Sequence, residues 1–127
     1  MNRLPLPAFS TLPVTRSPSG IPTVQLSAAQ HGARNHFVAL QWMQPGERVF
    51  RHTHTVEETL LFLSGTGVIT LEDETWMIQP ESSLFIPAGA RHGFVAEGNM
   101  ELRVVVVFPV PYFAETLFTG EDGPAND

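Results

Sequence analysis

The chain has 127 residues, which is the size of one domain, and 43% of them are hydrophobic, enough to build one buried core. It contains no cysteine, so disulfides and thiolate metal sites are excluded, and any metal must be held by His, Asp, Glu or backbone oxygen. The net charge is −6, the seven basic residues are scattered arginines, and no apolar stretch could span a membrane, so we expect neither a nucleic-acid nor a membrane partner.

The first segment, residues 1–35, carries five prolines. Proline removes a ladder hydrogen-bond donor, so it confines a segment to loops or edge strands. We expect an N-terminal arm or edge strands that wrap the domain or a partner subunit, with a loose tail equally open for the first dozen residues. Prolines also interrupt the apolar run that a secretory signal would need, so we expect a cytoplasmic protein.

The middle segment, residues 36–110, reads as seven or eight short strands separated by turns. We expect strands over 36–43, 49–54, 58–65, 67–78 (two strands with an acidic turn at 72–74), 82–86, 92–99 and 101–108. Many short strands with closely spaced turns are typical of an all-β sandwich or barrel.

The last segment, residues 111–127, differs from the strands before it. The sequence "PYFAETLF" at 111–118 predicts one or two helical turns, with proline at their start. The remaining tail, 119–127, is polar and glycine-rich, and we expect it to be disordered.

A cluster of potential metal ligands begins in the strand at 49–54. Residues i and i+2 of a strand project to the same face, so His52 and His54 could converge on one ion. Glu58 opens the next apolar strand, and His92 begins a strand after a Pro-Gly turn. Three imidazoles and one carboxylate suit Fe, Mn, Ni, Co, Zn or Cu as divalent ions.

The spacing of these residues resembles the first motif of the cupin superfamily, in particular its small single-domain members. All five signature positions match: Gly46, His52, His54, Glu58 and Gly65.

The second cupin motif is matched in part. Pro87, Gly89 and His92 are present, whereas Glu81 stands where glycine is usual and Ala96 where asparagine is usual. A side chain at position 81 disfavours positive φ, so we expect a type I turn there.

The resemblance implies a double-stranded β-helix, the jelly-roll barrel of cupins. It also implies that His52, His54, Glu58 and His92 bind one divalent metal ion (Fe, Mn, Ni or Zn) and leave room for water or substrate. In some relatives of this kind the carboxylate leaves the metal, so Glu58 is our candidate catalytic base.

A mainly apolar substrate pocket is expected beside these ligands. Strand alternation places Phe50 with the histidines of its strand, Phe94 with His92, and Leu60 and Phe62 on the face of Glu58. We therefore expect Phe50, Leu60, Phe62 and Phe94 to line the pocket.

Three functions remain open from the sequence. The first is a metal-dependent enzyme, either a dioxygenase or a cyclase, isomerase or lyase, acting on a small, oxygenated, partly apolar molecule. The second is a non-catalytic small-molecule-binding or sensor domain, and the third is a barrel that metal merely rigidifies. We also expect a homodimer, because the strand at 102–108 and the outward positions Leu61 and Leu63 would leave an apolar sheet face exposed in a monomer.

Overall fold

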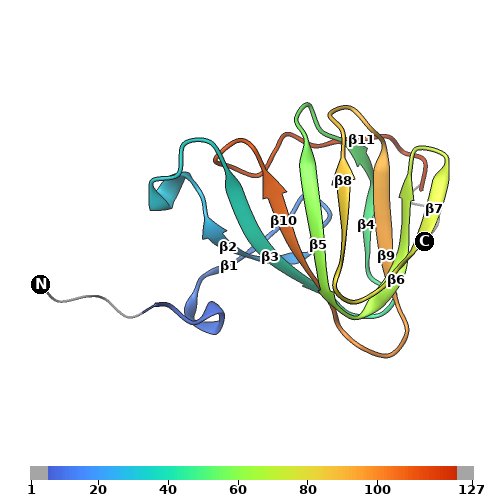
Figure 1. The fold of residues 1–127 in the computed structure, drawn as a ribbon, viewed down its shortest axis with the longest axis horizontal. Coiled ribbons are helices and arrows are strands. Elements are labelled where there is room, and N and C mark those ends of the chain that lie inside the picture. The colour runs from blue at the N-terminus through green and yellow to red at the C-terminus, as the bar shows by residue number, and fades with distance from the viewer. Residues whose placement is uncertain (1–5, 123–127) are drawn as a thin grey trace, which may run out of the picture.

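The computed structural model describes residues 6–122, which form two antiparallel sheets packed face to face (Figure 1). The six-stranded sheet has the order β1-β2-β3-β10-β5-β8, and the five-stranded sheet has the order β11-β4-β9-β6-β7. Chain neighbours thus alternate between sheets along much of the barrel, and the expected all-β jelly-roll is confirmed.

The element bounds follow in chain order. The strands are β1 (Val14–Arg16), β2 (Pro22–Ser27), β3 (Phe37–Met43), β4 (Arg48–Thr53), β5 (Glu58–Ser64), β6 (Thr66–Leu71), β7 (Glu74–Ile78), β8 (Ser82–Ile86), β9 (His92–Glu97), β10 (Leu102–Phe108) and β11 (Leu117–Phe118). Two short 3-10 turns, η1 (Phe9–Thr11) and η2 (Ala29–His31), are the only helical segments within residues 6–122. None of the described helices is long and apolar enough to cross a membrane.

Strand β10 shows how the core forms. Its burial alternates strictly, with Leu102, Val104, Val106 and Phe108 facing the interior and each no more than 1% exposed. Successive side chains of a strand point to opposite faces, so this register sends one apolar row into the core and the other outward. β10 pairs with β3 on one side and β5 on the other, which places it at the centre of the six-stranded sheet.

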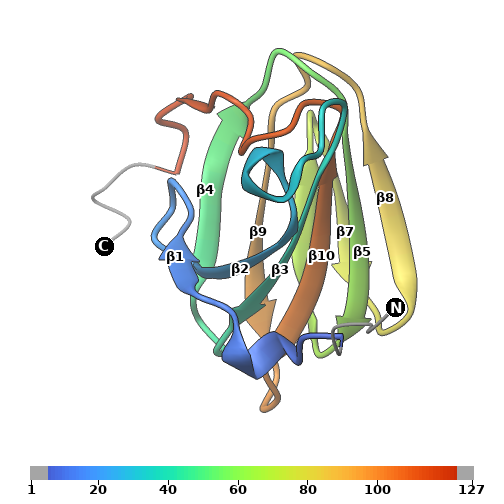
Figure 2. The same ribbon diagram turned by 90° about the vertical axis from the view of Figure 1, so that its left-hand side faces the viewer.

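The N-terminal part joins this sheet at its edge. β1 pairs with β2, and β2 pairs with β3, so both strands extend the six-stranded sheet outward (Figure 2). The turn between them, around residues 17–19, reaches the interior cavity described below.

The prediction of helical turns at 111–118 is wrong. Residues 111–116 form no regular element, and β11 pairs with β4 through Leu117–Thr53 and Phe118–His52. Pairing with a strand edge satisfies the backbone groups that a helix would have bonded internally, so tertiary structure overrides local helix preference. Residues 119–122 of the expected disordered tail continue along β4, and 123–127 lie outside the described residues.

The prediction of a type I turn at Glu81 is also wrong. Glu81 has φ of 61°, in the left-handed region, and its N–H donates to the carbonyl of Phe62 at 2.8 Å. The turn has the backbone geometry that glycine adopts easily. At Glu81 this geometry is strained, because the Cβ atom disfavours positive φ.

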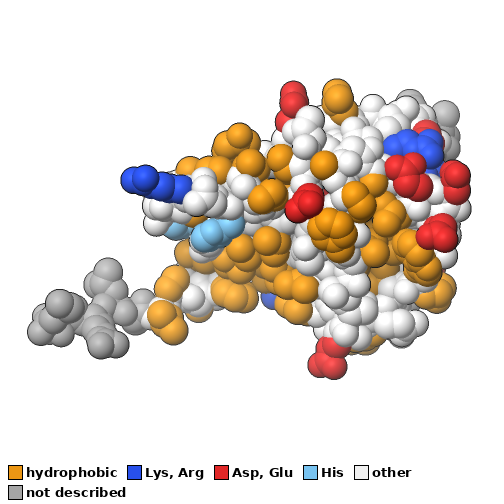
Figure 3. All heavy atoms as spheres, turned by 45° about the horizontal axis from the view of Figure 1, so that its top comes forward, with side chains coloured by type: hydrophobic (Ala, Val, Ile, Leu, Met, Phe, Trp, Pro, Cys, Tyr) orange, Lys and Arg blue, Asp and Glu red, His pale blue; other side chains and the backbone are white. Residues whose placement is uncertain are grey.

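Exposed side chains are unevenly distributed. Figure 3 shows hydrophobic side chains across much of one face, with acidic and basic groups gathered at the end where β7 lies. Arg91 bonds Glu72 and Glu121, each at 2.9 Å, and so links the β6–β7 turn to the C-terminal segment.

Candidate metal centre

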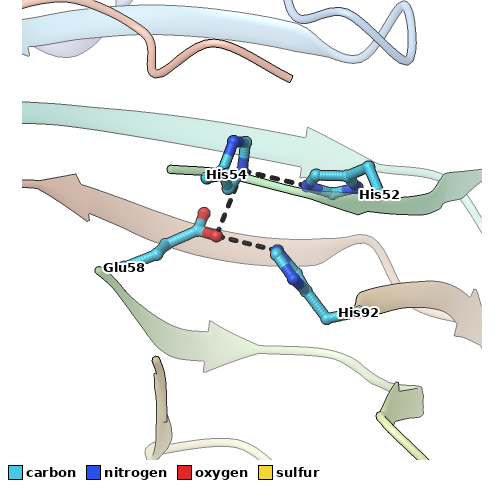
Figure 4. Close-up of side chains that lie close together, drawn as sticks. All are labelled: His52, His54, Glu58 and His92. Carbon is cyan, nitrogen blue, oxygen red and sulfur yellow. Dashed lines mark hydrogen bonds and ion pairs between the residues drawn. The ribbon is translucent and has the colours of Figure 1, made fainter. Parts of the chain in front are cut away.

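Four side chains from three strands and one loop meet inside the barrel (Figure 4). His52 lies on β4, His54 directly after it, Glu58 opens β5 and His92 opens β9. One ligand atom from each lies within 4.8 Å of the others, so the set predicted from the sequence converges on one point.

All four side chains are buried. The exposed fractions are 1% for His92, 4% for His54 and 5% for both His52 and Glu58. Burying polar groups is costly unless each one is bonded, so their partners determine what the cluster can do.

Each imidazole has one nitrogen bonded to a backbone carbonyl. Nδ1 of His52 donates to Phe50 O at 2.6 Å, that of His54 to Glu115 O at 2.9 Å, and that of His92 to Ala90 O at 3.0 Å. A carbonyl can only accept, so the proton lies on Nδ1 and every Nε2 presents a lone pair to the centre. This arrangement is typical of metal-binding histidines.

Within residues 6–122 no N–H or O–H group of another residue donates to the Nε2 atoms of His52 and His54. Nε2 of His52 and Nε2 of His54 lie 3.0 Å apart, with both protons committed to carbonyls. Oε1 of Glu58 lies 2.9 Å from His92 Nε2 and 3.4 Å from His54 Nε2. Four electron-pair donors facing one another repel unless a cation joins them, so the residues present fit a divalent ion of the N/O-preferring kind.

Burial and the neighbouring groups shift two pKa values here. The pKa of His52 is lowered to about 4, mainly by burial. The nearby His92 also lowers this pKa, and its effect outweighs that of the hydrogen bond to the Phe50 carbonyl, which raises it. Burial alone would raise the pKa of Glu58, but the contacts of its Oε1 with the imidazoles of His54 and His92 outweigh burial and bring the pKa to about 2. Both groups are therefore in their metal-binding forms at neutral pH.

A bulge in β4 turns Phe50 away from this cluster. Val49 pairs with Phe94 and His52 pairs with His92, so two residues of β4 face the single Gly93 of β9. The extra residue reverses the alternation, so Val49 and His52 both face inward. Phe50, which we expected in the pocket, is instead 39% exposed.

The family match extends over the region that carries the site. Residues 39–108, from β3 to β10 and including all four ligand residues, match the family described as the cupin domain. The chain is a cupin.

Relatives of this cupin include proteins of Streptomyces. It is 29% identical to Protein SchB of Streptomyces halstedii over 77% of the chain and 72% of SchB. It is 35% identical to Polyketide synthase CurC of Streptomyces cyaneus over 58% of the chain, and this match spans about half of CurC, 49%.

A solved structure agrees in fold. The polyketide cyclase RemF from Streptomyces resistomycificus superposes with a TM-score of 0.77 at 23% identity, over 94% of this chain and 85% of RemF. At that identity the likeness establishes the cupin fold and leaves the reaction open.

The cavity of this cupin contains two of the four expected pocket residues. Leu60 and Phe94 line it together with the four ligands. Phe62 is buried in the core instead, with its ring centroid 5.6 Å from that of Phe94.

Several lining residues were not identified from the sequence. They are Ser17, Pro18, Ser19, Gln41, Val49, Phe113 and Thr116. Alternation within 36–43 could have indicated Gln41, which faces inward with Ala39 and Met43. The others come from the two ends of the chain and from the bulge, and no local pattern marks them.

The cavity is narrow. Its free space is about 20 Å³, room for one water-sized group. A larger molecule has to displace part of the lining, and the lining residues of the turn at 17–19, together with Phe113 and Thr116, are less buried than the four residues of the cluster.

Proposed function

We propose that this cupin is a metal-dependent enzyme that acts on a small, oxygenated, partly apolar substrate by proton transfer next to a carbonyl, as a cyclase, isomerase or lyase does. The observation that carries the proposal is the pair of imidazole nitrogens 3.0 Å apart with their protons on the far side of each ring. Two nitrogen lone pairs that face each other do not stabilise the fold. A cation bound between them would make this short separation favourable.

The metal would be held by His52, His54, Glu58 and His92. When bound, it supplies Lewis acidity that polarises a substrate oxygen. Leu60, Val49 and Phe94 line the cavity beside these four residues and would exclude water from a bound substrate.

Glu58 would accept the substrate proton. Its Oε1 makes both imidazole contacts, and no residue between 6 and 122 hydrogen-bonds to its Oε2. A C–H bond of the substrate breaks, the proton moves to Oε2, and the electron pair stays on the substrate as an enolate.

The names of two similar proteins support this reaction class. CurC is a polyketide synthase protein by name and RemF a polyketide cyclase, and both names refer to substrates rich in carbonyl groups. A dioxygenase shares the same four ligands, so oxygen consumption must be measured beside proton transfer.

Metal content tests the first part. Untagged protein should contain one divalent ion per chain by elemental analysis, while His52→Ala and His92→Ala should contain almost none. His36→Ala, which changes an exposed histidine outside the cluster, is the control. Wild-type protein that neither contains metal nor gains melting temperature with Fe, Mn, Ni or Zn would refute the site.

Deuterium exchange tests the second part. A β-keto ester incubated in heavy water should exchange its carbon-bound hydrogen faster with the metal-loaded protein than with buffer, as read by NMR. Glu58→Gln should lower that rate at least ~10-fold while metal content is checked in the same sample. A ligand that binds but never exchanges would support the sensor function instead.

We also propose that two copies pair through the outer face of the six-stranded sheet. Leu61, Leu63 and Phe85 are 38%, 46% and 54% exposed there. They lie on the neighbouring strands β5 and β8, and Leu61 pairs with Val105 of β10. A second copy of this face is the occupant whose flat apolar surface matches it.

A further inference from the structure

Gln41 is a polar side chain in an apolar row. On β3 it faces inward between Ala39 and Met43, both 0% exposed, and it is itself 3% exposed. It lines the same cavity as the four metal ligands. A primary amide offers two donors and an acceptor oxygen, all of which need partners when buried.

A hydrogen-bond chain fixes the orientation of this amide. Thr23 Oγ1 donates to the carbonyl of Ile21 at 2.9 Å, which uses its only hydrogen. Its oxygen therefore accepts from Gln41 Nε2 at 3.2 Å. Nε2 consequently points toward Thr23, on the neighbouring strand, and Oε1 is the free acceptor of the amide.

The acceptor oxygen has no donor within the described chain. Among residues 6–122 no hydrogen bond is made to Gln41 Oε1, although the side chain is buried. Among residues 6–122 the fully buried side-chain polar atom without a partner is Arg51 Nε, so Gln41 Oε1 keeps accessible surface. The cavity that Gln41 lines is where the hydroxyl of a bound molecule can reach this acceptor.

We propose that Gln41 Oε1 accepts a hydrogen bond from a substrate hydroxyl and so selects hydroxylated substrates over their ethers. The ligand class is an enol or phenol that places one oxygen at the metal and a second, hydrogen-bearing oxygen at Gln41. This assignment rests on the proposed metal site and adds the group that recognises the substrate. Thr23 acts as a positioning residue, because it holds the amide in the accepting orientation.

The probe is a matched pair of small phenols. Resorcinol has two hydroxyls in a 1,3 arrangement, while 3-methoxyphenol replaces one with a methyl ether and cannot donate there. Both are titrated by calorimetry into zinc-loaded protein, since zinc has no redox chemistry to consume them. Zinc content is measured first in every variant.

The expected result is a loss of selectivity. Wild type should bind resorcinol about 10-fold more tightly than 3-methoxyphenol, the effect of one good hydrogen bond. Gln41→Leu should remove most of that ratio by weakening resorcinol alone. Thr23→Val should reduce the ratio while leaving Gln41 in place, and Thr23→Ser, which keeps the hydroxyl, should restore it.

The outcomes separate the two proposals. Wild type that binds no zinc overturns the metal site. If zinc binds and the resorcinol preference is equal in wild type, Gln41→Leu and Thr23→Val, the amide serves only the fold and the inference is wrong. Zinc-loaded wild type that binds no resorcinol also overturns it.

Discussion

Phe50 and Phe94 are aromatic residues on paired strands with opposite environments. Phe94 is 6% exposed and contacts the cavity, whereas the bulge in β4 leaves Phe50 39% exposed beside Phe118. We predict that Phe94→Ala lowers the free energy of unfolding by about 3–4 kcal/mol, and Phe50→Ala by about 1 kcal/mol. Urea unfolding of both variants measures this, and equal losses would contradict the bulge.

His52 should make the metal-free protein sensitive to acid. Its pKa is lowered to about 4 from 6.5, so the unfolded chain binds more protons between these values and stability falls as pH falls through this window. We expect a loss of about 3 kcal/mol from pH 7 to pH 4 in chelator-treated protein. Glu58, with a pKa lowered to about 2, adds a further loss only below pH 4.5.

Denaturant titrations at several pH values measure this dependence. His52→Asn should flatten the curve between pH 6.5 and 4, while the exposed His36→Asn serves as the control and keeps the wild-type curve. A wild-type curve already flat in that window would show that His52 is not buried as a neutral ring.

At the scale of elements, the Pro80–Glu81 turn stores local strain. Glu81 has φ of 61°, a region that costs a residue with a Cβ about 1–2 kcal/mol. Glu81→Gly should therefore stabilise the protein by about 1 kcal/mol, after part of the gain is offset by greater freedom of the unfolded chain. Glu81→Ala retains the Cβ and should gain nothing, and thermal unfolding of the three proteins compares them.

The strands were largely predictable because hydrophobic alternation is read locally. The sequence "LRVVVVF" alternates in burial along its whole length as β10. The cluster of four candidate metal ligands was predictable because their offsets fall within two short motifs.

The errors in prediction have non-local causes. The outward orientation of Phe50 results from the extra β4 residue opposite Gly93, and the spacing of residues in the sequence does not reveal this bulge. The segment 111–118 contains good helix formers, but β11 pairs with a strand about 60 residues earlier in the chain. Ser17 and Thr116 line the cavity because the fold brings the two ends of the chain together beside it, and no local sequence pattern marks them.

At the scale of the whole molecule, pairing of two copies should be visible in solution. The wild type should sediment at twice the chain mass of 14.0 kDa. Leu61→Glu places a charge on the proposed interface and should shift the mass toward one chain. Met77→Glu makes the same chemical change at a residue 66% exposed on β7 of the other sheet, and it should leave the mass unchanged. A wild-type mass of one chain would refute the pairing.

The residues that line the cavity come from two different parts of the chain. The four candidate metal ligands all lie within the stretch 39–108 shared with other cupins, whereas Ser17, Pro18, Ser19, Phe113 and Thr116 lie outside it. Substitutions at the two ends of the chain can therefore alter the cavity lining without changing His52, His54, Glu58 or His92. Under the proposed function, laboratory evolution toward a new substrate has its safest targets there, because the four candidate ligands stay unchanged.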